Sequence, residues 1–229
     1  FSLMLSSPFR AGVVPVCDCP LPSWLNGYAL ATKEFSTLDL HHVDRAIFVG
    51  GNVSCGDRAL HSVIIGSNGK NPVSFVGGQG RSDCSFNFAP SVELLSQQHK
   101  DELRDRWVGL ENTALDITEK SYQSNDANSY ASYLIKKVDQ GGQYDQGVSG
   151  CHMTIDMAQV RVENPLHAED DGKTLLVLTG EGTVCLTNTN EGRQFGPSVL
   201  APFAHIETTD SVGFVDGYII ARSAHLRGS

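Results

Sequence analysis

A pattern of apolar and small residues occurs twice near the C-terminal end of the chain, at a spacing of 20 residues. The copies read "SVLAPFAHIE" (residues 198–207) and "YIIARSAHLR" (residues 218–227). A repeat of this length is typical of one coil of a solenoid, in which each coil buries its inward residues only against neighbouring coils. The alternative is that two strands of a β-sandwich match by chance. The matched pairs are Val199 and Ile219, Leu200 and Ile220, Ala201 and Ala221, Ala204 and Ala224, His205 and His225, and Ile206 and Leu226.

Stacking makes a definite prediction for these pairs. Equivalent positions of successive coils in a β-solenoid lie about 4.8 Å apart. We therefore expect Ile219 to lie directly over Val199, with both side chains in the core. Leu226 should lie over Ile206 in the same way. The alanine pairs are expected at tight corners, where larger side chains would clash.

Other segments carry short apolar runs that fit further strands. Residues 46–52, 62–68 and 74–78 are β-branched runs that stop at glycine, which can supply positive φ at a corner. The unequal spacing of these runs predicts irregular coils. Residues 152–164 and 173–188 are also expected to form strands.

One segment has helical periodicity instead. Residues 90–110 place Val92, Leu95, Leu103, Trp107 and Leu110 on a single stripe, which predicts an amphipathic helix along the side of the solenoid. Residues 129–138 fit either a helix or a strand. The predicted fold is therefore mainly β: a right-handed β-solenoid (β-helix) over residues 28–229 with one packed α-helix. Residues 1–27 are expected to form a disulfide-containing lead-in.

Composition limits the classes of partner. The 229 residues carry a formal net charge of −9 without a basic stripe, which argues against nucleic-acid binding. No apolar run approaches the roughly 18 residues of a membrane-spanning helix, so we expect no membrane insertion by this segment. The first residue is not methionine, which suggests that the chain begins after a removed leader.

The cysteines point to an oxidising compartment. Their spacing lacks the paired C-x₂-C units of a zinc site, so disulfides are the favoured interpretation, with pairing undetermined. Asn52 begins an Asn-Val-Ser acceptor sequence for N-glycosylation. We therefore expect a secreted protein, at the cell surface or in the cell wall. The six cysteines are Cys17, Cys19, Cys55, Cys84, Cys151 and Cys185.

Four segments together resemble one family. Residues 43–55 read "VDRAIFVGGNVSC", residues 86–98 read "FNFAPSVELLSQQ", residues 196–204 read "GPSVLAPFA" and residues 217–223 read "GYIIARS". Their motifs and order resemble the choice-of-anchor A domain of bacterial and fungal surface proteins. The first segment lacks the glycine that the family carries before the position of Arg45. The resemblance extends from about residue 28 to residue 226.

The resemblance implies a β-helix-like adhesive domain on surface proteins whose anchors differ. Similar closing strands occur in ice-binding β-solenoids, which also pack a helix along one wall. The Cys17-Asp18-Cys19 sequence and the insert at residues 111–150 depart from the bacterial pattern. These additions suggest a eukaryotic, fungal member with added disulfides.

Enzyme motifs are sparse. The acidic residues 167–173 ("HAEDDGK") are the best calcium candidate, although a solvated turn explains them better. A metal shared by His205 and His225 is a weaker possibility than an outward polar ladder. The sequence shows no phosphate-binding loop, metalloprotease helix or nucleophile elbow. We therefore predict no catalytic residue and no metal or other cofactor.

The leading hypothesis is a non-enzymatic adhesion or structural domain that binds an extracellular glycan or protein surface and could self-associate. The alternative is a carbohydrate-active β-helix enzyme, which requires clustered carboxylates and a base along a groove. Ice binding is weaker still, because the threonine-rich stretches are expected in loops.

Overall fold

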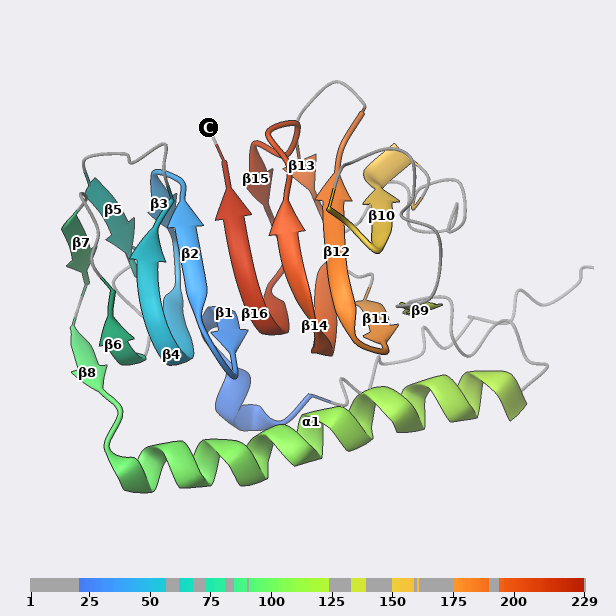
Figure 1. The fold of residues 1–229 in the computed structure, drawn as a ribbon, viewed down its shortest axis with the longest axis horizontal. Coiled ribbons are helices and arrows are strands. Elements are labelled where there is room, and N and C mark those ends of the chain that lie inside the picture. The colour runs from blue at the N-terminus through green and yellow to red at the C-terminus, as the bar shows by residue number, and fades with distance from the viewer. Residues whose placement is uncertain are drawn as a thin grey trace, which may run out of the picture.

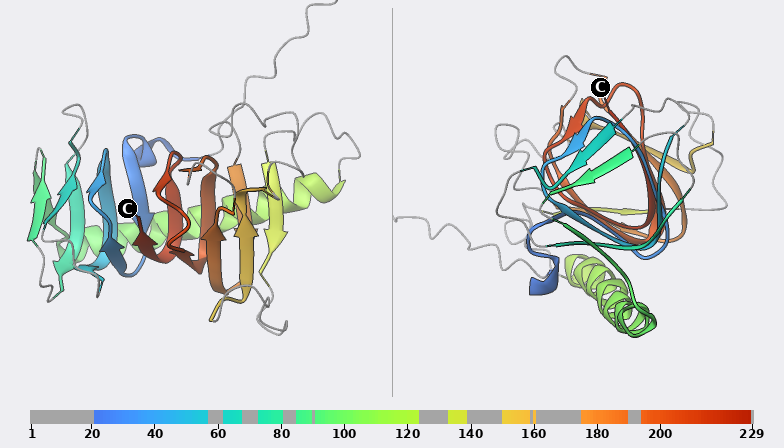
Figure 2. Two further views of the ribbon diagram at one scale, coloured as in Figure 1. Left: turned by 90° about the horizontal axis from the view of Figure 1, so that it is seen from above. Right: turned by 90° about the vertical axis from the view of Figure 1, so that its left-hand side faces the viewer.

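The fold is mainly β with one long helix. The computed structural model describes residues 21–56, 62–67, 73–80, 85–89, 91–123, 133–138, 150–158, 160, 175–189 and 194–228. The strands described there form sheets of eleven, three and two strands, in which every pairing is parallel. Viewed from the end, they lie along three sides of a roughly triangular outline (Figure 2). This arrangement is consistent with a solenoid-like architecture.

The strands fall into three walls. The helix wall contains β1 (Tyr28–Thr32), β8 (Val92–Leu94), β9 (Tyr133–Lys137) and β11 (Leu175–Thr179). The polar wall contains β2 (Ser36–Asp39), β10 (Met153–Asp156) and β12 (Gly182–Thr187). Four strands contribute to both walls: β4 (Ala46–Cys55), β6 (Ser74–Gln79), β14 (Ser198–Thr208) and β16 (Ile219–Arg227). The third wall holds β3 (His42–Val43), β5 (Ser62–Ile65), β7 (Ser85–Phe88), β13 (Gln194–Phe195) and β15 (Phe214–Val215).

The spatial order of the strands does not follow their order in the chain. The C-terminal strand β16 pairs with β14 on one side and with the first strand β1 on the other. The described strands therefore begin in the middle of the stack with β1, continue outward to β8, and are followed by helix α1 (Gln97–Gln123), which crosses to the opposite end (Figure 1). The strands that follow α1 then return to the middle. A helix of 27 residues is about 40 Å long, and eight stacked strands span about 34 Å, so α1 is long enough to bridge the stack.

The helix begins and ends later than the sequence predicts. Residues 92–94, expected in its first turns, instead form β8 and pair with β6. The helix starts after Ser96, whose Oγ accepts a hydrogen bond from the backbone N–H of His99 at 3.2 Å and caps the first turn. It continues past Leu110, because Ala114 and Ile117 extend the buried stripe. The ladder with β6 outweighs the helical periodicity of "PSVELL".

The strands of the helix wall are buried on both faces. Inward residues such as Val199 and Ile219 join the central core. The alternate residues, such as Leu200 and Ile220, pack with the helix stripe in a second core. Burial on both faces explains why these strands are apolar at successive positions. Within the described residues, no helix is long and apolar enough to span a membrane.

The predicted stacking of the two C-terminal segments holds only in their first half. Val199 pairs with Ile219, and the next two residues of each segment continue the register to Ala201 and Ala221. The register then shifts by two residues at the corner, so the later pairs predicted from the sequence are wrong. The observed partners between β14 and β16 there are His205 with Ser223, Ile206 with Ala224, and Glu207 with His225.

The glycines predicted at corners are present there, but mostly for another reason. Gly66 has a φ of +77°, as expected. Gly50 and Gly77 do not have positive φ; a Cβ on Gly50 would collide with the carbonyl of Lys33, and one on Gly77 with the carbonyl of Gly50. Close approach of stacked backbones therefore excludes a side chain at these corners. Residues 129–138, left open by the sequence, contain the strand β9.

Candidate functional site

The polar wall carries a group of interacting polar and charged side chains from separate strands. Its core-facing residues are apolar, for example Ile206 and Leu226, and they alternate with outward polar residues along each strand. Parallel pairing brings the outward residues of separate strands side by side. The outward set comprises Phe35, Thr37, Ser54, His205, Glu207, Ser223, His225 and Arg227.

His205 lies between a hydroxyl and a carboxylate. Its Nδ1 lies 2.8 Å from Ser223 Oγ, and its Nε2 lies 3.5 Å from Glu207 Oε1. A carboxylate needs a donor, so the fitting tautomer has its proton on Nε2, and Nδ1 then accepts the Ser223 hydroxyl. Burial lowers the pKa of His205 and outweighs the opposing effect of Glu207. The imidazole is therefore neutral at neutral pH.

Arg227 joins the second histidine to the same carboxylate. Its guanidinium donates to Glu207 Oε2 at 3.3 Å and to His225 Nδ1 at 3.1 Å. Because Nδ1 of His225 accepts, its neutral ring carries the proton on Nε2, which has no hydrogen-bond partner among the described residues. Burial lowers the pKa of His225, and Arg227 lowers it further. The two histidines are linked through Glu207 and Arg227 and do not stack on each other.

The order serine, histidine, glutamate resembles a hydrolase triad, yet its geometry does not suit a nucleophile. Ser223 is 2% exposed. The ring of Phe35 lies 5.7 Å from the ring of His205, which is the partner of Ser223 on the neighbouring strand. A substrate carbonyl has no open approach to a hydroxyl covered in this way. Glu207 is held by a histidine and an arginine, which fits a fixed structural carboxylate better than a catalytic acid.

The predicted disulfides are shown in part. Cys151 and Cys185 form one disulfide, which joins the segment before β10 to β12. Cys55 is also disulfide-bonded. The predictions for Cys17, Cys19 and Cys84 lie outside the described residues.

Asn52 lies in β4 and is exposed. It follows the corner glycines and precedes Val53, which pairs with Ser36. A glycan at Asn52 would therefore project from the polar wall, on the strand next to Phe35. Its glycosylation stays a prediction.

The metal candidates do not come together. The acidic residues 167–173 lie outside the described residues. His205 and His225 are on different registers, and within the described part of the chain no group of three His, Cys, Asp or Glu residues is arranged to hold a metal ion.

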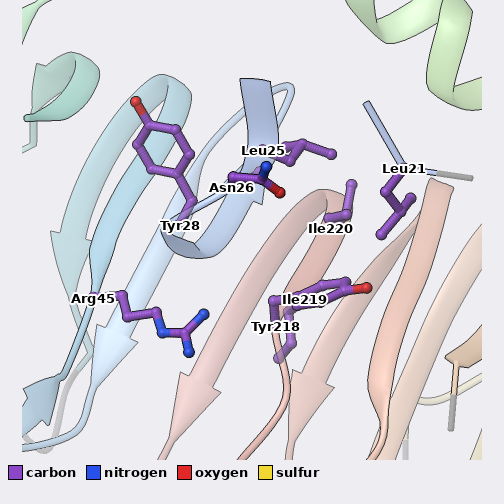
Figure 3. A pocket seen from close by; sticks show the side chains of 10 residues that line it. Leu21, Leu25, Asn26, Tyr28, Arg45, Tyr218, Ile219 and Ile220 are labelled. Atoms are coloured by element: carbon purple, nitrogen blue, oxygen red, sulfur yellow. The ribbon is translucent and has the colours of Figure 1, made fainter. Parts of the chain in front are cut away.

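A small cavity lies where the start of β16 meets β1. It has a volume of about 90 Å³ and is lined by Leu21, by Leu25 at the end of the short 3₁₀ turn η1 (Ser23–Leu25), and by Ile220 (Figure 3). Arg45 supplies the only charged group in the lining. Binding pockets for small molecules are commonly several hundred Å³, so this cavity suits a packing gap better than a ligand site.

Comparison of the chain with protein-family models, curated proteins and solved structures finds no match. The resemblance to choice-of-anchor A domains and to ice-binding solenoids therefore rests on the sequence motifs alone. The sequence predicted an outward polar ladder at His205 and His225, but it missed the contacts of both histidines with Glu207 and Arg227. Only the alternation of apolar and polar residues in 203–208 and 223–227 could have indicated the wall.

Proposed function

We propose that the chain is a right-handed β-solenoid of the choice-of-anchor A type and acts as a non-enzymatic adhesion or structural domain of a secreted or cell-wall protein. The observation that supports this most is the polar wall. Side chains from β14, β16, β2 and β4 stand next to one another there because the strands pair in parallel. Such a wall presents a row of contacts to an extended surface rather than a pocket to a small molecule.

The internal contacts of the wall favour binding over catalysis. Its ionisable groups are engaged with each other: Glu207 contacts both His205 and Arg227. Groups held in this way are positioned before any partner arrives, so binding costs little side-chain entropy. A catalytic group would need a free proton site open to substrate, whereas the unpartnered Nε2 of His225 is buried.

The disulfide between Cys151 and Cys185 supports a location outside the reducing cytosol.

The strand at one end of the sheet supports self-association of the chain. The edge strand β8 carries Leu94, which is 69% exposed. An exposed edge strand with an apolar side chain favours pairing with another chain.

The test places a bulky charged side chain on the wall. Thr37→Arg projects from β2, where Thr37 Oγ1 lies 3.3 Å from Ser54 Oγ. The matched control is Thr113→Arg on the helix surface, where the threonine is equally partly exposed. Both are produced in a bacterial periplasm, where disulfides form and Asn52 carries no glycan.

Retention is measured on immobilised protein, acidic polysaccharide and neutral polysaccharide. We expect Thr37→Arg to lower retention on at least one surface by about tenfold, and Thr113→Arg to bind like the unmodified chain. Equal retention of both variants, or no retention of the unmodified chain on any surface, would overturn the proposal. Release of reducing or unsaturated ends from a polysaccharide would favour an enzyme instead.

A further inference from the structure

An exposed aromatic ring lies on the polar wall beside His205. Phe35 is 47% exposed and lies at the entry to β2. Its ring is tilted by 36° to the ring of His205, with Ser223 on the strand between them. Ser223 is buried there, whereas Phe35 is partly open to solvent. Exposing such a ring has a cost in water, which a flat apolar partner would remove.

The charges around this ring are already compensated. Arg222 Nε lies 3.9 Å from Glu34 Oε2, and Arg227 is paired with Glu207. His205, between these pairs, is neutral at neutral pH because burial lowers its pKa. Among the described charged groups next to the ring, a strongly anionic or cationic polymer would have to compete with these existing ion pairs.

The strand register places hydroxyl and amide side chains next to Phe35 on the same wall. Thr37 and Ser54 lie on adjacent strands, and the exposed Asn52 is on the strand next to Phe35. Neighbouring strands repeat at about 4.8 Å, which is close to the length of one sugar unit in an extended glycan. An apolar ring beside neutral hydrogen-bonding groups matches the two faces of a pyranose: its C–H face and its hydroxyl edge.

We infer that the polar wall binds an uncharged polysaccharide, with one sugar ring stacked on Phe35 and its hydroxyls directed to Thr37, Ser54 and Asn52. The inference rests on the proposed function and names the class of surface that the wall takes. A protein surface or an acidic polysaccharide is the competing occupant.

The experiment compares two exposed phenylalanines. Phe35→Ala removes the ring on the wall, and Phe214→Ala removes one that is 52% exposed on the third wall. Phe35→Tyr keeps a stacking ring. Each protein, free of glycan, is tested for retention on chitin, cellulose, polygalacturonate and immobilised albumin. Circular dichroism and urea unfolding verify that each variant is folded.

Retention on chitin or cellulose is expected for the unmodified chain, with a loss of about tenfold or more for Phe35→Ala. Phe214→Ala should bind normally, and Phe35→Tyr should restore binding. Normal retention of Phe35→Ala would overturn the inference. Retention only on polygalacturonate or albumin, abolished by Thr37→Arg, would overturn it while leaving the proposed function intact. Absence of retention on all four surfaces would remove both.

Discussion

Trp107 joins the helix to a corner where the ladder between β14 and β16 is interrupted. The register of β14 against β16 shifts between Ala201 and His205, so the backbone of Pro202 lies outside the regular pairing. The carbonyl of Pro202 accepts a hydrogen bond from the Trp107 indole N–H at 3.0 Å, and the indole is fully buried. The helix therefore supplies a hydrogen-bond donor to a carbonyl that has no partner in the regular strand pairing.

Replacing Trp107 by phenylalanine should destabilise the fold by about 2–4 kcal/mol. The buried carbonyl loses its donor, which costs about 1–3 kcal/mol. The smaller ring also leaves a cavity among Ala114, Leu200 and their neighbours in the second core, which adds about 1 kcal/mol. The matched control is Val108→Ala, one residue further along the helix and 48% exposed, which should change stability by no more than about 0.5 kcal/mol.

Equilibrium urea unfolding, followed by far-ultraviolet circular dichroism, measures both variants. The midpoint should fall for Trp107→Phe at an unchanged slope, because the surface exposed on unfolding stays the same. A loss equal to that of Val108→Ala would refute the reasoning. It would mean that neither the indole bond nor the packing of Trp107 holds the helix to the strands.

Three further outcomes are expected. Replacing both Cys151 and Cys185 by serine removes a cross-link between positions 34 residues apart, and urea unfolding should show a loss of about 4 kcal/mol; an unchanged midpoint would contradict this. Gly50→Ala should lower the melting temperature by calorimetry, because its Cβ meets the backbone of the neighbouring coil; an equal or higher melting temperature would show that the corner can relax. The pKa values of His205 and His225 are lowered in the folded protein from the ordinary histidine value of about 6.5. As the pH falls below 6.5, the unfolded chain therefore binds more protons than the folded chain. The free energy of unfolding should therefore be unaffected by these two groups above pH 6.5 and decrease as the pH falls below it. Replacing both histidines by glutamine should make the free energy of unfolding less dependent on pH in this range.

The pattern of apolar residues in short segments was sufficient to predict several strands and the buried face of the helix. The runs around Val49, Leu176 and Ile219 are apolar at successive positions, and they became strands covered on both faces. The stripe from Leu103 to Leu110 became the buried face of the helix. These features follow from side-chain periodicity, which is a property of short segments.

The polar wall could not be derived in the same way. Its central contact joins Glu207 of β14 with Arg227 of β16, and which outward residues meet depends on a two-residue shift at the corner. An ungapped alignment placed His225 beside His205 and missed the partner that it has. A shift of two residues keeps every side chain on its own face, so the alternation of polar and apolar residues carries no trace of it.

The amino-acid sequence by itself determined that the chain is mainly β, that one amphipathic helix interrupts the strands, and which residues face the core. Assembly decided the order of the coils, with β16 beside β1 and α1 spanning the stack, and it placed residues 92–94 in a strand. The physical reason is range. Burial and turn chemistry act within a few residues, whereas parallel pairing joins segments as distant as Leu30 and Ile219, whose contact gains free energy only when the intervening chain has folded.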